Sequence, residues 1–149
     1  MRTCRLGLLF ILMFAAAFIC EAQVSGKGIS SLPEKVKPAF IAKFPKSSEL
    51  IWSASENTIW ASFKDGNDYF DAYFKDSGEW LKTEHVIEEK LLPKAVLDSL
   101  KSGEFKTWQT GSVYKVELPG NDSIFKLFVY SPDWYEMELN FDKNGKRLL

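Results

Sequence analysis

One pattern constrains the fold of this 149-residue chain more than any other, because it occurs twice. The repeated residues are a Leu-Pro pair and two apolar residues at helical spacing, namely Leu32, Pro33, Val36 and Phe40 in the first copy and Leu92, Pro93, Val96 and Leu100 in the second. Each copy continues into alternating, aromatic-rich sequence and ends on a glycine turn, Phe74 to Gly78 in the first and Phe141 to Gly145 in the second. A repeated unit must bury one face against a neighbouring element. We therefore predict an α+β fold of two tandem helix-plus-antiparallel-meander units, with the helices packed on one sheet face.

The repeat also predicts where the units begin and end. Residues 23–30 are rich in Ser and Gly, which indicates a short flexible lead. We expect residues 31–90 to form the first repeat and residues 91–149 the second, joined in one compact globular unit. The second repeat is about seven residues longer, and its extra residues fall mostly around Trp108 and before Trp134.

An apolar leader precedes the repeats. Arg2 and Arg5 are followed by an apolar run from Leu6 to Ile19, which is too short to span a bilayer comfortably, and then by the small residue Ala22. This order is typical of a secretory signal peptide over residues 1–22. We therefore expect an exported protein, periplasmic or secreted, with no transmembrane span in the mature chain.

The composition of the mature chain narrows the function. Cys4 and Cys20 both lie in the leader, so the mature chain has neither disulfides nor a thiol nucleophile nor a thiolate metal site. Without the leader's two Arg and one Glu, 17 basic and 19 acidic side chains remain of the 19 and 20 in the whole chain. They are interspersed, which predicts no nucleic-acid surface. An acylated Cys20 would tether the chain as a lipoprotein, but the residues before it are bulky where such processing sites usually have small ones.

Helical and strand periods predict the elements of each unit. A capping-box pattern at Ser31 and Glu34 starts the first helix. Pro38 kinks this helix or delays its start, and Pro45 ends it. The second helix is expected over residues 93–101. The expected strands are residues 50–54, 58–64, 68–75 and 79–85 in the first unit and 113–118, 123–130 and 134–141 in the second.

Strand alternation predicts an outward aromatic face. If Ile59, Ala61 and Phe63 face the first helix, the residues between them point to the opposite side. Nine Phe, five Trp and five Tyr follow the leader, more than two small helices and a sheet need for internal packing, so part of this area should face outward. The candidate binding residues are Trp52, Trp60, Tyr69, Asp71, Tyr73, Tyr130 and Trp134. The alternative is that this stripe packs against the other repeat or against the insertion around Trp108.

Three other groups of residues indicate structure rather than chemistry. His85 lies beside Glu84, and a single His among exposed glutamates is typical of a surface position. Glu136 and Glu138 share a strand face, so they cannot flank a bond from opposite sides as glycosidase carboxylates do. Residues 142–145 lack the spaced acids of a calcium loop and predict a hairpin turn. We therefore predict no catalytic residue, no metal site and no cofactor.

The pattern as a whole resembles a known family. A leader, two Leu-Pro helices with aromatic strands, and the Phe-Asp-Lys-Asn-Gly-Lys ending at Phe141 to Lys146 are similar to the β-lactamase-inhibitor-like, PepSY-like family of secreted and periplasmic bacterial proteins. The resemblance covers nearly all of residues 31–149 and implies an α+β protein with two tandem units. It also implies inhibitory or regulatory binding, with which PepSY domains are associated. The first copy departs from the pattern at its turn, where Lys75 and Ser77 replace Asp and Asn.

We therefore expect a non-enzymatic, exported binding or inhibitor-like module that recognises a protein partner in the cell envelope through its aromatic sheet face. The alternative is a small-ligand or glycan-binding periplasmic protein that stacks its ligand on the same aromatics. A purely structural envelope protein is a third possibility.

Overall fold

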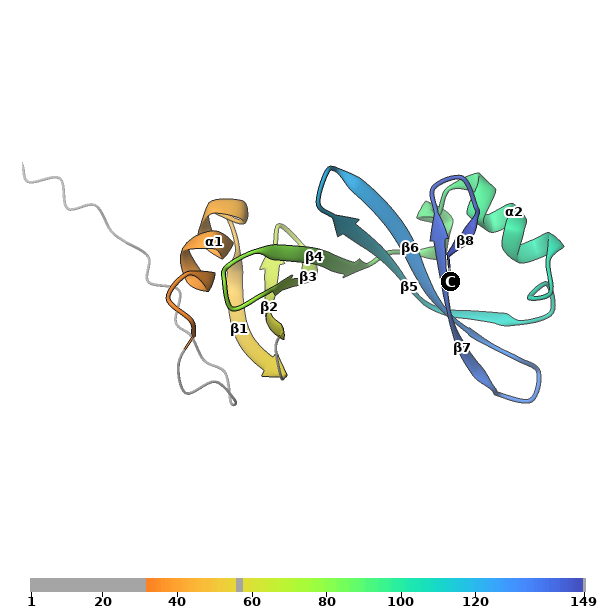
Figure 1. Ribbon diagram of the computed structural model, residues 1–149. Coiled ribbons are helices and arrows are strands. Elements are labelled where there is room, and N and C mark those ends of the chain that lie inside the picture. Colours follow the sequence, from red (N-terminus) through yellow and green to blue (C-terminus); the bar gives the residue numbers. More distant parts are fainter. Residues whose placement is uncertain (1–31, 56–57, 149) are drawn as a thin grey trace, which may run out of the picture.

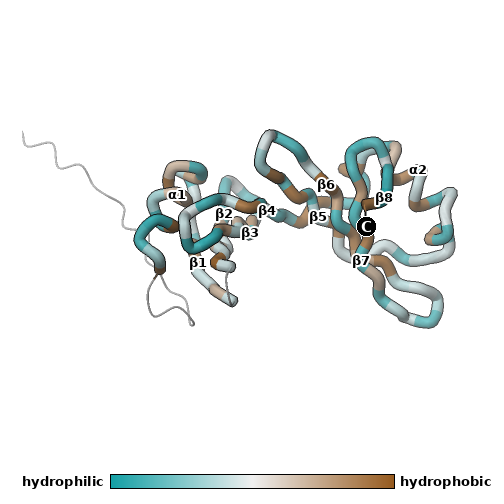
Figure 2. Tube along the Cα trace, viewed as in Figure 1, coloured by the Kyte–Doolittle hydropathy of each residue, from teal (hydrophilic) through white to brown (hydrophobic). Residues whose placement is uncertain are grey.

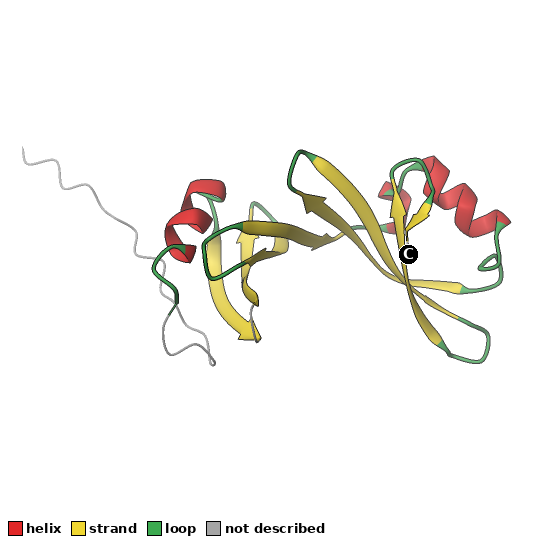
Figure 3. Cartoon of the chain, in the orientation of Figure 1, coloured by secondary structure: helices red, strands yellow, loops and turns green. Residues whose placement is uncertain are grey.

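The eight strands that the structure describes form one antiparallel sheet, in which they lie side by side in chain order (Figure 1). The computed structural model describes residues 32–55 and 58–148. Its elements are α1 (Val36–Lys43), β1 (Ser48–Ser55), β2 (Thr58–Asp65), β3 (Asp68–Phe74), β4 (Trp80–Val86), the 3-10 helix η1 (Glu89–Leu91), α2 (Lys94–Ser102), β5 (Gln109–Leu118), β6 (Asp122–Tyr130), β7 (Glu136–Asp142) and β8 (Arg147–Leu148). The predicted α+β class is confirmed. Figure 3 shows the two α-helices at opposite ends of the molecule, and no helix in the described ranges is long and apolar enough to cross a membrane.

The two helices begin later than their Leu-Pro pairs. The N–H of Val36 donates to the Pro33 carbonyl at 3.0 Å and starts α1, so Pro38 lies in the first turn, where its missing N–H leaves no partner unsatisfied. The N–H of Val96 donates in the same way to the Pro93 carbonyl at 2.9 Å. Ser31 of the predicted capping box, the lead over residues 23–30 and the leader with Cys20 lie outside the described residues.

Each helix covers its own hydrophobic cluster. Phe40 of α1 packs edge-on against Trp52 and Phe63, with ring centroids 5.2 and 5.0 Å apart. Val96 and Leu100 of α2 lie in a second cluster with residues of β5, β6 and β7. Figure 2 shows the hydrophobic residues along the strands and helices, whereas the turns are mostly hydrophilic.

Both helices lie on the same face of the sheet. A row of cross-strand partners leads from Phe70 through His85 and Lys115 to Phe125. Phe70 packs against the α1 cluster and Phe125 belongs to the α2 cluster. Because directly opposed residues in antiparallel strands point to the same side, α1 and α2 cover one face and leave the other without a helix. We call this second face the open face.

Two glycine turns pack against the starts of the two helices. Gly78 and Gly145 have φ of +83° and +79°, which glycine adopts readily. A Cβ at Gly78 would lie 2.7 Å from the carbonyl oxygen of Lys35, and one at Gly145 would meet that of Ala95 even more closely. Neither turn can accept a side chain without moving its helix.

The prediction that Trp52 faces away from the first helix is wrong. The Ser55↔Thr58 pair sets the register of β1 on β2, and this register places Trp52 opposite Ala61 on the helix-covered face. Trp52 is 1% exposed and packs against Phe40 of α1. Alternation within a strand was predicted correctly, but the relative phase of two neighbouring strands depends on their register.

Alanine substitution of Trp52 and of Trp60 should lower the free energy of unfolding by different amounts, because the two residues lie on opposite faces of the sheet. Trp52→Ala is expected to lower the free energy of unfolding by about 3–5 kcal/mol, because it leaves a cavity in the α1 cluster. Trp60→Ala, a matched change on the open face, should cost less than about half as much. Urea unfolding of both variants at pH 7 measures the difference, and equal losses would contradict the assignment of the faces.

Candidate binding surface

The open face carries alternate side chains of β1 to β7. One row of partners leads from Trp60 through Tyr73 to Lys82, and Tyr130 lies opposite Glu136 at the far end of the sheet. Of the predicted binding residues, six lie on this face or at its edge, namely Trp60, Tyr69, Asp71, Tyr73, Tyr130 and Trp134. Trp52 does not contribute, because it lies in the core.

A stacked aromatic pair occupies the part of the open face formed by β2 and β3. The rings of Trp60 and Tyr73 are 6.2 Å apart and inclined by 26°, and both residues are half-buried. The ammonium group of Lys82 lies 4.5 Å from the centre of the Tyr73 ring. Asp71 accepts a hydrogen bond from the Ser62 hydroxyl, and the exposed Tyr69 donates one to Glu49 at 2.9 Å.

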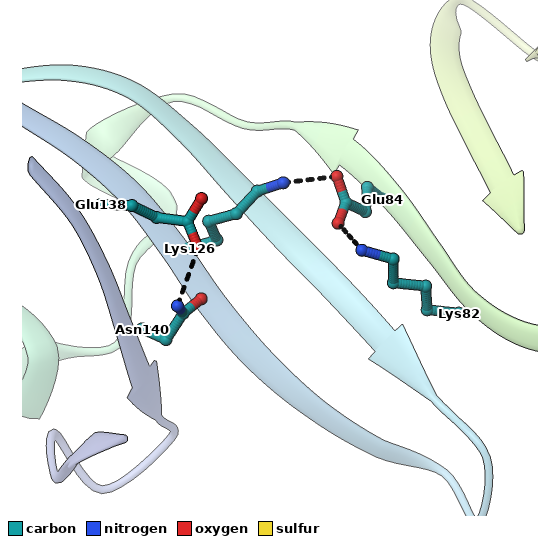
Figure 4. Close-up of polar contacts among 5 residues, drawn as sticks. All are labelled: Lys82, Glu84, Lys126, Glu138 and Asn140. Atoms are coloured by element: carbon teal, nitrogen blue, oxygen red, sulfur yellow. Dashed lines mark hydrogen bonds and ion pairs between the residues drawn. The ribbon is translucent and has the colours of Figure 1, made fainter. Parts of the chain in front are cut away.

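A buried carboxylate joins the two halves of this face (Figure 4). Glu84 of β4 is only 5% exposed, and its two oxygens accept hydrogen bonds from Lys82 at 2.6 Å and from Lys126 at 2.5 Å. Lys126 comes from β6, so its side chain crosses β5 to reach Glu84. The expectation that Glu84 is an exposed glutamate is wrong. Its lysine partner on β6 is 42 residues away in sequence, and no local pattern indicates that pairing.

The surroundings of Glu84 and Tyr73 shift the pKa values of both side chains. Burial raises the pKa of Glu84, but the hydrogen bonds from Lys126 and Lys82 outweigh it, so the pKa lies below its ordinary value and the carboxylate stays ionised. Burial, followed by the nearby charges of Glu84 and Asp71, raises the pKa of Tyr73 to about 12. Tyr73 therefore remains a neutral hydroxyl at physiological pH.

A second aromatic group lies on β5 and β6. The Tyr114 and Phe128 rings meet edge to face with centroids 6.1 Å apart, and the Lys126 ammonium lies 4.7 Å from the Tyr114 ring centre. Tyr130 and Trp134 lie at the end of the same face, with ring centroids 6.4 Å apart. Trp108 packs on the helix side, 5.2 Å from Phe105. The insertion around Trp108 therefore does not cover the open face.

The remaining polar groups have structural contacts. His85 is half-buried on the helix side, against Phe70, rather than at the surface; burial and then the charge of Lys115 lower its pKa. Asp142 accepts from the N–H groups of Asn144 and Lys146 at 2.8 and 2.9 Å, which closes a hairpin as predicted. Within residues 32–55 and 58–148, no group of three or more His, Cys, Asp or Glu residues could hold a metal ion.

Known proteins resemble this chain in sequence pattern and fold. A family model described as "Putative beta-lactamase-inhibitor-like, PepSY-like" matches residues 57–148. Among curated proteins, none matches the chain in sequence.

Three solved structures from Bacteroides share the fold. A DUF2874 family protein from Bacteroides ovatus ATCC 8483 is 22% identical with a TM-score of 0.74, over 81% of this chain and 87% of that one. A protein from Bacteroides eggerthii DSM 20697 described among "putative periplasmic proteins" is 21% identical with a TM-score of 0.73, over 80% and 87%. A "BLIP-like protein" from Bacteroides fragilis NCTC 9343 is 20% identical with a TM-score of 0.71, over 82% and 86%. The chain therefore has a BLIP-like fold.

Removal of the buried carboxylate should make stability less dependent on pH. Glu84→Gln is expected to lower the free energy of unfolding at pH 7 by about 1–3 kcal/mol, because two ammonium groups lose their partner. Since the native pKa of Glu84 lies below the ordinary value of 4.5, its contribution is complete above that value and is lost as the pH falls through the native pKa.

The stability difference between wild type and Glu84→Gln should therefore narrow below about pH 4.5. Urea unfolding between pH 3 and pH 7 measures it. Glu79→Gln, which removes an exposed carboxylate paired with Lys75 at 2.9 Å, is the matched control and should cost under about 1 kcal/mol. A constant difference across this range would contradict the assignment.

Proposed function

This chain belongs to the family described as β-lactamase-inhibitor-like, PepSY-like, and from that premise we propose that it is a non-enzymatic, exported module that binds a protein partner through the open face of its sheet. The observation that carries the proposal is a sheet face that neither helix covers and that holds aromatic side chains from four strands, β2, β3, β5 and β6. The description of the Bacteroides eggerthii protein as periplasmic supports export.

The chemistry of the open face suits protein recognition. Aromatic anchors surrounded by charged groups are characteristic of interfaces, and Trp and Tyr dominate their binding energy. Glu84 holds the ammonium groups of Lys82 and Lys126 beside Tyr73 and Tyr114, so these side chains need little ordering when a partner binds. A preorganised surface loses less side-chain entropy on binding and gains affinity accordingly.

We propose further that residues 31–90 and 91–149 are two copies of one unit. Each copy has a helix over its own hydrophobic cluster, and each ends on a glycine turn that packs against the start of that helix. The copies would place two aromatic groups on one continuous face. Removal of residues 1–22 as a signal peptide would leave residues 23–30 as a lead to the first copy.

A glycan or small-molecule ligand is the second candidate, because the stacked rings of Trp60 and Tyr73 could support a sugar ring. The cavity beside Asp71, Glu84 and Tyr114 has a volume of about 120 Å³. Ligand pockets are typically about 300–1,000 Å³. On the open face, this small volume favours a protein partner over an enclosed small ligand.

The proposal is tested by capture of partners from the cell envelope. Residues 23–149 are immobilised, and the captured proteins are quantified by mass spectrometry for wild type, Trp60→Ala, Tyr73→Ala and Ile41→Ala. Ile41 is the matched control, because it is 52% exposed on α1, away from the open face. Each open-face variant should lower capture of the same protein at least tenfold, as expected for an aromatic anchor.

As a control, the urea unfolding curve of each variant is compared with that of the wild type to check that the variant is folded. Capture that Trp60→Ala and Tyr73→Ala leave unchanged would contradict the proposal. A saccharide-dependent change in Trp fluorescence that Trp60→Ala abolishes would instead support the glycan candidate.

A further inference from the structure

Three hairpins of the sheet share one turn geometry. They join β3 to β4, β6 to β7 and β7 to β8. In each, the N–H of the fourth turn residue donates to the carbonyl of the first at 2.9–3.0 Å, and the N–H of the first donates to the carbonyl of the residue that follows the turn. The fourth residue has a positive φ each time, +83° at Gly78, +63° at Trp134 and +79° at Gly145. Two hairpins have glycine at this position, and one has tryptophan.

The fold alone does not favour tryptophan there. A residue with a Cβ is strained in the left-handed region, where glycine is not. Burial does not offset this strain, because Trp134 is 75% exposed, the highest exposure among the large hydrophobic residues that the structure describes. A residue that strains the backbone and contributes little to the core is best explained by a contact outside the chain.

The hairpin of Trp134 is also longer than its counterpart in the first unit. Only Gly66 and Asn67 separate β2 from β3, whereas residues 131–135 separate β6 from β7. This longer hairpin projects at the lower right of Figure 1. If the two units are copies, the added residues are those that present Trp134.

The neighbouring ring is fixed in place. A Cβ at Gly111 would lie 2.5 Å from Cε2 of Tyr130, so the Tyr130 ring packs directly over the glycine backbone. Tyr130 in turn contacts Trp134, with ring centroids 6.4 Å apart. The two rings form an aromatic corner at the end of the open face.

The charges around this corner are negative. Asp133 precedes Trp134 in the turn, and Glu136 and Glu138 lie on the open face of β7, all three exposed. Within the part of the chain that the structure describes, none of these carboxylates forms an ion pair with Lys or Arg. Lys126, which lies on this face of the neighbouring strand β6, is already paired with Glu84. Glu138 accepts a hydrogen bond from the neutral Asn140 amide at 2.9 Å, which does not neutralise its charge. A partner that lies here meets aromatic faces and carboxylates that no Lys or Arg of the described residues neutralises.

We propose that Trp134 is a main anchor of the docking surface and that the partner presents a cationic segment to it. An Arg or Lys side chain of the partner stacks on the rings of Trp134 and Tyr130 and pairs with the carboxylates of Glu136 and Glu138. Aromatic faces and carboxylates both attract guanidinium and ammonium groups. The inference rests on the proposed function and adds the chemistry of the partner.

The first experiment compares stability. Trp134→Gly should raise the melting temperature by about 2–5 °C, because glycine removes the strain at this position. If the melting temperature rises, any loss of binding in Trp134→Gly cannot be caused by damage to the fold. A fall in the melting temperature would show that Trp134 stabilises the chain and would overturn the argument from strain.

The second experiment measures recognition with a defined probe. A displayed library of random dodecapeptides is selected on wild-type residues 23–149, and the selected clones are tested against Trp134→Gly and against the double variant Glu136→Gln and Glu138→Gln. We expect clones enriched in Arg and Lys, with binding at least tenfold weaker to both variants and weaker at high salt. Replacing their Arg residues with Gln should remove binding.

The two proposals fail in different ways. Clones that depend on Trp60 and Tyr73 but bind Trp134→Gly as strongly as wild type would overturn this inference and leave the proposed function intact. Clones whose binding no open-face substitution weakens would count against both the proposed function and this inference. If the selected clones are not enriched in Arg or Lys, the proposal that the partner presents a cationic segment is wrong.

Discussion

The pairing of β4 with β5 is the constraint on which the rest of this structure depends. Four partner pairs, Thr83↔Glu117 to Val86↔Tyr114, join the strands beneath α1 to the strands beneath α2. Because opposed residues point to one side, this register decides that both helices cover the same face. A shift by one residue would turn the second half over and place α2 on the opposite side. The continuous open face, with aromatic groups from both halves, is a consequence of this register.

Glu84 contributes to the same junction from the open face. A buried carboxylate needs partners that compensate for its desolvation, and Lys82 and Lys126 supply them from β4 and β6. The two lysines then lie over the rings of Tyr73 and Tyr114, one in each half of the sheet. The cluster therefore connects the two aromatic groups and orders the side chains between them.

The turns show how stability and recognition differ within one fold. Gly78 and Gly145 serve the fold, since both have positive φ and both pack against a helix start where a side chain would clash. Trp134 has the same backbone conformation without a comparable packing role, and its ring is exposed. Functional positions often keep a local strain that the remaining structure tolerates. In this protein, the strained position lies at the end of the face that is proposed to bind.

The sequence by itself determined the local features: the two Leu-Pro helices with Val36 and Val96 buried, the glycine turns, the inward and outward alternation within each strand, and the family. These follow from residue type and short-range spacing. Only the tertiary structure decided that Trp52 lies in the core and that Glu84 is buried between two lysines. The first depends on the register of β1 on β2, and the second on a contact across three strands. Such long-range pairings are set by packing and loop geometry together, so no local pattern in the sequence contains them.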